Sequence, residues 1–346
     1  MKFELSRLHA FVVDVLTEVD VLADHAEITA ARLLEADLRG RTGHGIIRLP
    51  QYVKRIEAGG INLQPDIAET RSTPVSCLVD GDNGLGQVVM TLAAEAAINR
   101  AAEIGMAWVG TVRSNHAGAG GVYTDMAMRR DLIAIYMAVA SANVMPPWGG
   151  RERLLGTNPI SIAIPAGEGH GFQLDIATTV TSHGTIKVLA QRGEPMPEGW
   201  VMDDQGNAIT DPGRADEGFL VPIGGYKGAG LNLAIGLLAG VLNDAAFGAD
   251  VIDHRRVPDA PANTGQAIFV MRPDLFRGVD EFKADIDRHI SQMRASGDPG
   301  AVHVPGDGAV RLEREQRASG IPLPDVLLSQ LRSLADRFDL EDRLSG

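Results

Sequence analysis

A short apolar run leads directly into a glycine-rich turn that carries a histidine, and this pairing constrains the chain more than any other feature. The run is Met106-Ala107-Trp108-Val109-Gly110, and Ser114-Asn115-His116 follows it, with Gly118, Gly120 and Gly121 next. A strand that ends in a glycine loop lets the backbone approach a ligand closely, and an imidazole titrates near neutral pH. The segment therefore predicts a ligand site at the end of a strand.

Length and composition are those of an ordinary soluble globular protein. The 346 residues are enough for two domains, and 45% of them are hydrophobic and 22% charged. With 32 basic and 45 acidic residues the formal net charge is -13, which opposes binding to nucleic acid or to an anionic membrane. An anionic substrate would therefore need a local cationic pocket.

The single cysteine, Cys77, excludes an internal disulfide and any multi-cysteine metal site, so we expect a reducing compartment and no metal. The first residues, Met1-Lys2-Phe3-Glu4, mix acid and base and open no long apolar run, which predicts neither a signal peptide nor a membrane anchor. The longest apolar stretches stop short of a membrane-spanning length. We therefore expect a soluble, cytoplasmic protein.

The first 75 residues are expected to be mainly helical. A first helix has Ser6 as its N-cap, a second starts at Asp24 and stops near Gly40, and a third opens at Pro50 and ends at Gly59-Gly60. The apolar positions of the first helix, at helical spacing, are Leu8, Phe11, Val12, Val15, Leu16 and Val19.

From about residue 76 short apolar runs alternate with helical patterns, which predicts an α/β (or α+β) body. Strands are expected at 106–112, 132–140, 160–164 and 266–271, and helices at 87–103, 121–130 and 231–247, the last apolar and buried. Amphipathic helices return at 280–294 and 323–338. We expect residues 1–75 and 275–346 to form one helical domain around a cofactor-binding body at 76–274.

None of the glycine motifs is a Rossmann fingerprint, which needs Gly-x-Gly-x-x-Gly between a strand and a helix. Gly84-Leu85-Gly86 has Val89 in place of the third glycine, and Gly118-Ala119-Gly120 has Tyr123 there. Gly225-Tyr226-Lys227-Gly228 is not a phosphate-binding P-loop, because no Ser or Thr follows the lysine. A dinucleotide would have to bind to another architecture.

Further short motifs accompany the histidine loop. In chain order they are Gly43-His44-Gly45 with Arg48, Pro147-Trp148-Gly149-Gly150, Gly156-Thr157-Asn158-Pro159, Asp175-Ile176-Ala177-Thr178 and Gly225-Tyr226-Lys227-Gly228. This ordered set resembles the malate/L-lactate dehydrogenase family of NAD(P)-dependent oxidoreductases, which do not use a Rossmann fold. The resemblance runs from Ala36-Asp37-Leu38-Arg39-Gly40 to Gly320-Ile321-Pro322-Leu323-Pro324, nearly the whole chain.

The resemblance implies a homodimer that reduces a 2-oxo or 2-imino acid with NADH or NADPH, or that runs the reverse reaction. The residues that it implies for the cofactor are His116, Gly118, Ala119, Gly120, Ser141, Asp175, Ile176, Ala177, Lys227 and Gly306. Those that it implies for the substrate are His44, Arg48 and Thr157.

Hydride transfer to a 2-oxo acid requires the same residue types, independently of the resemblance. Hydride delivered to a carbonyl carbon leaves an alkoxide that must take a proton, and the imidazole of His44 or His116 is suited to give it. The carboxylate of a substrate suits a two-pronged, permanently charged donor such as Arg48. Each residue also has an ordinary structural interpretation: a histidine between glycines is often a turn residue, and an arginine is more often in a surface ion pair.

Two positions depart from the family pattern. Many members have Ser-His-Gly where this chain has Gly43-His44-Gly45, and Thr185 stands, after Gly184, where Lys or Asp is common. A serine-to-carboxylate relay tuning His44 therefore cannot operate here in that form, which leaves the proton donor open between His44 and His116. A carbonyl needs its proton only as the alkoxide forms, so we expect 2-oxo acids to be better substrates than imines.

The sequence thus predicts a cytoplasmic, homodimeric NAD- or NADP-dependent oxidoreductase that interconverts small 2-oxo and 2-hydroxy acids. A reductase of cyclic 2-imino acids is the alternative enzyme. A non-catalytic dinucleotide-binding protein of the same fold is the alternative from another class, although retention of His44, Arg48, His116 and Lys227 together argues against it. The identity of the acid, the choice of NAD or NADP and the physiological direction stay open.

Overall fold

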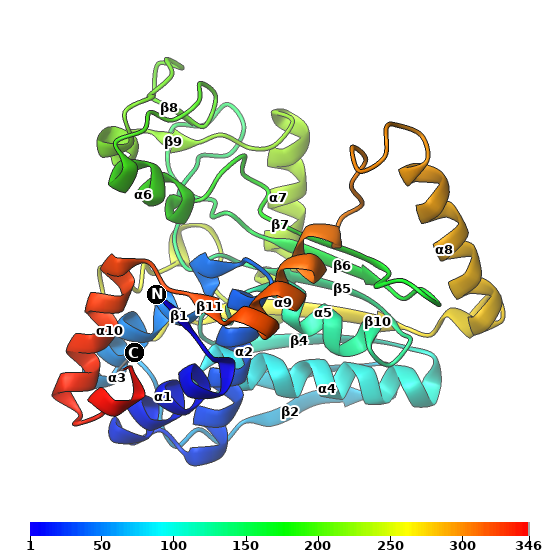
Figure 1. The fold of residues 1–346 in the computed structure, drawn as a ribbon, viewed down its shortest axis with the longest axis horizontal. Helices are drawn as coiled ribbons and strands as arrows, with labels where there is room; N and C mark the ends of the chain where they lie inside the picture. Colours follow the sequence, from blue (N-terminus) through cyan, green and yellow to red (C-terminus); the bar gives the residue numbers. More distant parts are fainter. Residues whose placement is uncertain (345–346) are drawn as a thin grey trace.

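A seven-stranded mixed sheet forms the centre of the molecule, with strand order β2-β3-β4-β10-β5-β6-β7 (Figure 1). The structure is a computed structural model that describes residues 1–344. The strands of this sheet are β2 Ala68–Thr73, β3 Ser76–Asp80, β4 Met106–Ser114, β5 Ile133–Ala138, β6 Ile160–Ile164, β7 Phe172–Ile176 and β10 Thr264–Met271.

The strand directions distinguish this sheet from a doubly wound parallel one. β3 and β4 are parallel, because helix α4 (Gly86–Ile104) carries the chain back between them. β10 comes late in the chain, yet it inserts between β4 and β5 and pairs antiparallel with both. β5, β6 and β7 continue as antiparallel neighbours. The expected mixed α/β fold without a Rossmann sheet is confirmed.

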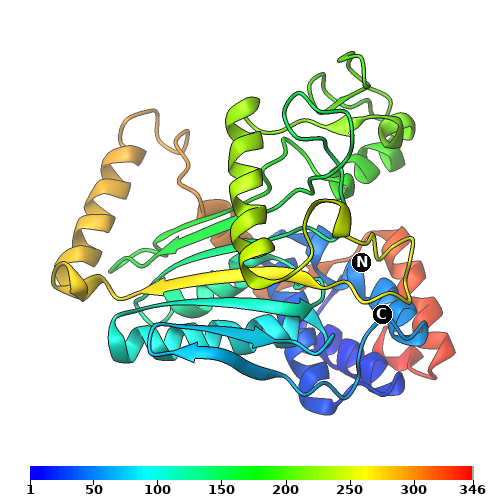
Figure 2. The same ribbon diagram turned by 180° about the vertical axis from the view of Figure 1, so that it is seen from behind.

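Helices cover both faces of the sheet, and the alternation of side chains along β5 shows which helix lies where. Ala134, Tyr136 and Ala138 belong to the apolar core under α4 and α5 (Gly120–Met128). Met137, one residue out of phase, belongs to a smaller core under α7 (Tyr226–Ala239). Figure 2 shows α7 crossing the sheet on the face opposite to α4.

The N-terminal helices share one core with the end of the chain. α1 (Leu5–Glu18), α2 (Ala23–Leu38) and α3 (Leu49–Glu57) pack with α10 (Asp325–Arg337), and the predicted apolar face of α1 is buried in this core. β1 (Lys2–Phe3) pairs with β11 (Ile321–Pro322), so that the two ends of the chain lie close together (Figure 1). The division into domains at residues 75 and 275 stays a prediction.

Two smaller parts project from the sheet. α6 (His183–Arg192) packs with β8 (Val201–Met202) and β9 (Phe219–Leu220) over a small apolar core of its own. α8 (Val279–Arg294) has no buried residue, and it leads into α9 (Asp307–Ser319). In Figure 1 the α6 part stands beside α7, and α8 lies at the opposite end of the sheet.

Two predicted helix starts differ slightly from the structure. α1 begins at Leu5, so Ser6 lies inside the first turn and does not cap it. α2 begins at Ala23, and Asp24 accepts the backbone N–H of His25 within the first turn. In both helices the apolar spacing located the helix correctly, whereas the polar residue chosen as the cap is the second residue of the helix, two positions after the actual N-cap.

The apolar helix expected at 231–247 is the largest correction. It runs from Tyr226 to Ala239, and Gly240 ends it. The expectation that it is buried is wrong for its outer side. Four leucines of α7 are between 39% and 45% exposed: Leu231, Leu233, Leu237 and Leu238. The opposite side is buried through Asn232, which hydrogen-bonds to the loops beside β6 and β7.

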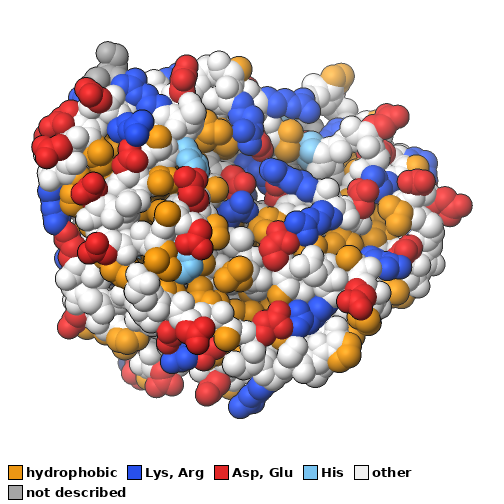
Figure 3. Space-filling model, turned by 90° about the horizontal axis from the view of Figure 1, so that it is seen from below, with side chains coloured by type: hydrophobic (Ala, Val, Ile, Leu, Met, Phe, Trp, Pro, Cys, Tyr) orange, Lys and Arg blue, Asp and Glu red, His pale blue; other side chains and the backbone are white. Residues whose placement is uncertain are grey.

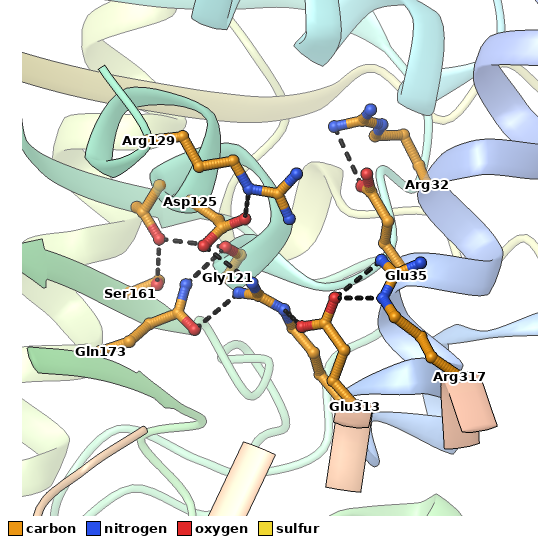
Figure 4. Close-up of polar contacts among 11 residues, drawn as sticks. Arg32, Glu35, Gly121, Asp125, Arg129, Ser161, Gln173, Glu313 and Arg317 are labelled. Carbon is orange, nitrogen blue, oxygen red and sulfur yellow. Dashed lines mark hydrogen bonds and ion pairs between the residues drawn. The ribbon is translucent and has the colours of Figure 1, made fainter. Parts of the chain in front are cut away.

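A buried guanidinium at the end of α2 ties four elements together. Arg39 pairs with Asp125 of α5 at 2.8 Å and with Glu313 of α9 at 3.1 Å. It also donates to Gln173 Oε1 of β7 at 2.8 Å. The side chains of Arg39 and Asp125 are 10% and 7% exposed, so water screens this pair little. Figure 4 shows Asp125, Gln173 and Glu313 converging from their three elements.

Replacing the Arg39 side chain tests how much its ion pairs contribute to the stability of the fold. Arg39→Met removes the buried cation that Asp125 and Glu313 share and leaves each carboxylate with only a half-exposed arginine, Arg129 or Arg317, so we expect the free energy of unfolding in urea to fall by about 3 kcal/mol. Arg317→Met is the matched control, because it removes the half-exposed second partner of Glu313 and should cost about 1 kcal/mol or less. Equal losses in the two variants would contradict the role given to Arg39.

Candidate functional site

One buried asparagine holds the loop after β4. Asn115 is 4% exposed, and its Nδ2 donates to the backbone oxygens of Asn83 at 3.0 Å and Gly84 at 2.8 Å. Its Oδ1 accepts from Arg55 of α3 at 2.9 Å. His116 follows directly, so these contacts of Asn115 fix the backbone at the residue before it.

Helix α4 begins against the same loop. A Cβ atom at Gly86 would lie 2.3 Å from the backbone oxygen of Asn115 and 2.5 Å from that of His116. Such an approach is possible only for glycine. The next residue, Gln87, is fully buried behind the loop.

A buried carboxylate shapes the segment that follows α2. This segment makes two short 3-10 turns, Thr42–His44 and Ile46–Arg48. Asp37 accepts the backbone N–H of Ile46 at 2.7 Å, and a Cβ atom at Gly45 would lie 2.0 Å from the Asp37 carboxyl. Glycine at 45 therefore lets the chain wrap around the carboxyl group. Burial raises the pKa of Asp37 to about 7.

Three histidines from distant parts of the chain meet at this turn. The ring centroids of His44 and His116 lie 5.6 Å apart with an interplanar angle of 14°, and His254 lies 6.1 Å from His116. Burial, together with nearby arginine charges, lowers the pKa of His44 to about 3 and that of His254 to about 4. The same causes bring the pKa of His116 well below its usual value. All three rings are therefore neutral at pH 7.

Arg48 lies beside these rings, half-buried and without an acidic partner among residues 1–344. Its Nε donates to the backbone oxygen of Gly43 at 2.6 Å, and its Nη1 lies 3.4 Å from Gln51 Oε1. A second cation nearby, Arg255, is already paired with Asp253 at 2.7 Å. A guanidinium in this state can bind a small carboxylate through two parallel hydrogen bonds.

Asp175 lies where β7 meets the start of α5. A Cβ atom at Gly121 would lie 2.9 Å from its Oδ2, and the Gly121 amide donates to the carboxyl group. Burial raises the pKa of Asp175. Arg41 Nε lies 3.5 Å from this carboxyl group, and the same arginine lowers the pKa of His44. The charge of Arg41 thus acts on both Asp175 and His44.

Four more predicted cofactor residues lie near the start of α5 or of β7. Gly118, Ala119 and Gly120 lead from His116 into α5, and Gly118 has a φ of +79° that favours glycine. Gly306 precedes α9 with a φ of +108°, and a Cβ atom there would lie 3.3 Å from the backbone nitrogen of Gln173. The segments around residues 118, 175 and 306 therefore come together at one end of α5.

The remaining predicted residues lie on segments that hydrogen bonds between neighbouring residues hold together. They are Ser141, Thr157, Ile176, Ala177 and Lys227. The Thr178 amide donates to the backbone oxygen of Thr157 at 3.0 Å, and Asn232 of α7 donates to Thr178 Oγ1 at 2.7 Å. Asn158 Oδ1 accepts the amide of Ala140, the residue before Ser141. Lys227 is exposed at the start of α7 and forms no ion pair with any residue between 1 and 344.

Several residues of this site were missed from the sequence. Tyr52 lies four residues after Arg48, which places both on one side of a helix, so its position was a usable signal. His254 stands among charged residues of a long loop, which was a weaker signal. Gln87 and Arg41 gave none, because only the fold brings them to the histidines and to Asp175.

The two positions that depart from the family pattern, Gly43 and Thr185, make few contacts with other side chains. No atom lies within 4 Å of a Cβ built on Gly43, and its φ is not positive, so the backbone would accept a serine. Thr185 lies in the first turn of α6, where its amide donates to the N-cap oxygen Ser182 Oγ at 3.2 Å. Neither position forces the residue found here.

We also searched residues 1–344 for metal-binding groups and for membrane-spanning helices. Within residues 1–344 no group of three or more His, Cys, Asp or Glu side chains is arranged to hold a metal ion. No helix in the same range is both long and apolar enough to cross a membrane.

Comparison with known proteins identifies the family. The model of the malate/L-lactate dehydrogenase family matches residues 3–332. The chain belongs to this family. A malate/(S)-sulfolactate dehydrogenase of Methanothermus fervidus is 36% identical over 335 residues, 96% of each chain. The NAD(+)-dependent ureidoglycolate dehydrogenase of Escherichia coli is 32% identical, covering 96% of this chain and 95% of the relative. The NADP(+)-dependent (2R)-3-sulfolactate dehydrogenase of Chromohalobacter salexigens is 30% identical, covering 96% and 97%.

Solved structures agree with this assignment. The sulfolactate dehydrogenase of Methanocaldococcus jannaschii superposes with a TM-score of 0.90 at 34% identity, covering 100% of both chains. A Δ1-piperideine-2-carboxylate reductase of Pseudomonas syringae has a TM-score of 0.88 at 26% identity, covering 97% of this chain and 100% of that one. The predicted family, the assignment as an oxidoreductase and the use of NAD or NADP are confirmed.

The buried carboxyl group of this dehydrogenase should make its stability depend on pH. Asp37 has a pKa of about 7 in the folded protein against 3.8 without burial, so the folded state keeps a proton that the unfolded state has lost. Its contribution to stability is full below about pH 4 and is lost as the pH rises through 7. Asp37→Asn still accepts the Ile46 amide but cannot ionise, so the wild type should lose up to about 4 kcal/mol relative to it over this range. Urea unfolding at several pH values measures the difference, and parallel curves would contradict the assignment.

Proposed function

We propose that this dehydrogenase interconverts small 2-oxo and 2-hydroxy acids, with a histidine exchanging the proton and Arg48 holding the substrate carboxylate. One observation carries the proposal: the Arg48 guanidinium has no acidic partner among residues 1–344, and it lies beside the stacked rings of His44 and His116. An unpaired, half-buried cation is stabilised when an anion binds, and a carboxylate matches its geometry.

The neutral state of the histidines suits the proton exchange. When a hydroxy acid is oxidised, the group that takes the hydroxyl proton must itself be unprotonated, and His44 and His116 are neutral at pH 7. A carboxylate bound to Arg48 offsets the positive charge that helps to lower both pKa values. The bound substrate therefore makes protonation of a ring easier, which the reverse reaction requires.

The residues around Asp175 fit a nicotinamide dinucleotide, which when bound supplies or accepts the hydride. Asp175 receives the Gly121 amide and leaves acceptor capacity for ribose hydroxyls. Gly118 has no side chain to obstruct a ligand, and Gly306 lets the segment before α9 pass close to His170 and Gln173. The 14-residue helix α7 begins without a side-chain cap, so its first amides and Lys227 suit a pyrophosphate. We assign Ala119, Gly120, Ser141, Ile176 and Ala177 to the wall of the same site, and Thr157 to the substrate side.

A cyclic imine reductase is the second candidate, since a Δ1-piperideine-2-carboxylate reductase has the same fold. The open surroundings of Gly43 and the capping contact of Thr185 provide no relay to tune His44, which favours a carbonyl substrate. A binding protein without turnover is the third candidate. The gathering of His44, Arg48 and His116 argues against it, because simple dinucleotide binding needs none of these three contacts.

We also propose that the enzyme works as a cytoplasmic homodimer. The exposed leucines of α7 continue into Val241 and Leu242, which are 55% and 62% exposed. Apolar side chains gathered on one helix face are typical of an interface, and a second copy of the chain is the proposed occupant. Cys77 is buried and unpaired, which suits a reducing compartment.

The carboxylate clamp gives the direct test of the activity. Arg48→Lys keeps the charge but loses the fork, so kcat/KM for a 2-oxo acid should fall about a hundredfold. The assay follows oxidation of NADH and NADPH with pyruvate, oxaloacetate, larger 2-oxo acids and a cyclic imine carboxylate. Arg256→Lys is the control, because Arg256 is 74% exposed on its side chain and far less confined. Unchanged kinetics in Arg48→Lys would remove Arg48 from the site, and preference of the wild type for the imine would favour the second candidate.

The proposed interface predicts a change of oligomeric state. Leu237→Asp combined with Leu238→Asp places two charges on the outer face of α7, where they cannot be buried against a partner. Light scattering should give twice the chain mass of 36.8 kDa for the wild type and the single mass for the variant. Val326→Asp, at another exposed apolar position on α10, should leave the dimer intact. A monomeric and fully active wild type would refute the interface.

A further inference from the structure

Tyr52 of α3 lies between Gln87 and His116 in an unbroken chain of hydrogen bonds. Its Oη is 2.7 Å from His116 Nδ1 and 2.7 Å from Gln87 Nε2. Tyr52 is 3% exposed and Gln87 is fully buried, so solvent does not replace either contact.

With the Gln87 amide oriented as in the structure, its Nε2 toward Tyr52, the protons of this chain have one direction. An amide nitrogen only donates, so Gln87 Nε2 donates to Tyr52 Oη. The hydroxyl group has a single proton of its own, and it donates this proton to His116 Nδ1. Burial raises the pKa of Tyr52 to about 12, so the hydroxyl keeps its proton at neutral pH. In a neutral imidazole whose Nδ1 accepts, the proton is on Nε2.

We propose that Tyr52, oriented by Gln87, is a positioning residue that keeps His116 in its Nε2–H tautomer, so that His116 donates a hydrogen bond to the substrate oxygen and His44 exchanges the proton. The proposal rests on the proposed function, which places both histidines against the substrate. No residue between 1 and 344 forms a hydrogen bond with His116 Nε2 or with either ring nitrogen of His44. Both histidines therefore have a nitrogen available to a ligand.

This arrangement divides two tasks between the stacked rings. In the oxidation of a hydroxy acid, a ring nitrogen of His44 takes the hydroxyl proton, the O–H bond breaks, and the hydride leaves the same carbon for the oxidised cofactor. The Nε2–H of His116 stays on the oxygen as it becomes a carbonyl. In reduction the same N–H stabilises the developing alkoxide, and protonated His44 returns the proton.

Reversing the chain tests the proposal. In Gln87→Glu an ionised carboxylate only accepts, so Tyr52 donates to it and its oxygen must accept from His116 Nδ1–H. Nitrogen-15 NMR of labelled histidine distinguishes the two tautomers. We expect Nε2–H in the wild type and in Gln87→Met, which removes the amide without adding an acceptor, and Nδ1–H in Gln87→Glu at pH 9.

The kinetic readout is a split between kcat and KM. Loss of one aligned donor to the substrate oxygen should lower kcat of Gln87→Glu about a hundredfold, whereas KM should change only a few-fold because Arg48 still holds the carboxylate. Tyr123→Phe is the matched control. Tyr123 is also buried, but its hydroxyl donates to the backbone oxygen of Ala117 at 2.5 Å, so neither the tautomer nor kcat should change.

The outcomes separate this proposal from the function on which it rests. An Nδ1–H tautomer in the wild type, or Nε2–H retained in Gln87→Glu at pH 9, would overturn the role of Tyr52 whatever the substrate is. If Gln87→Glu does not fold, the spectrum of the wild type alone still decides. Absence of turnover of every 2-oxo acid by the wild type would refute the proposed function and leave the tautomer result standing.

Discussion

The position of Arg39 at the end of α2 is the contact on which the rest of the site depends. Its guanidinium joins α2 to α5, α9 and β7 inside the molecule, where the carboxylates of Asp125 and Glu313 have little water to replace it. Asp37, two residues earlier, then lies where it can receive the Ile46 amide. The turns that follow carry His44 and Arg48 onto the His116 loop, so the buried ion pairs place the substrate residues on the sheet.

Desolvation is the second physical theme. Burial keeps three imidazoles neutral beside a guanidinium that has no carboxylate of its own among residues 1–344. Such a site is incomplete in electrostatic terms, and a small anion completes it. The chain as a whole carries a net charge of -13, but on the face in Figure 3 acidic and basic side chains are intermingled and apolar ones gather between them. The attraction for an anion is therefore local to the site.

Prediction from the sequence succeeded where a signal is local. The strand at 160–164 was located to the residue, since a short apolar run between turns has few alternative structures. His44 and His116 were singled out because each lies in a glycine-rich segment, and the structure stacks their rings. Prediction was wrong for the burial of α7, because apolar composition does not show whether the chain's own residues or a second copy cover a helix. Tyr52 and Gln87 were missed, since 35 residues separate them and only packing makes them partners.

The sequence by itself determined the family, the mixed α/β character, most of the helices and strands, and the residue types available for hydride and proton chemistry. Those properties depend on periodicity, turn residues and ordered motifs, all of which are written along the chain. Only the tertiary structure decided that β10 inserts between β4 and β5, that the histidines are neutral, and that Tyr52 donates to His116. These properties depend on burial and on the approach of distant segments, because desolvation and hydrogen-bond direction are set by atoms that are neighbours in space.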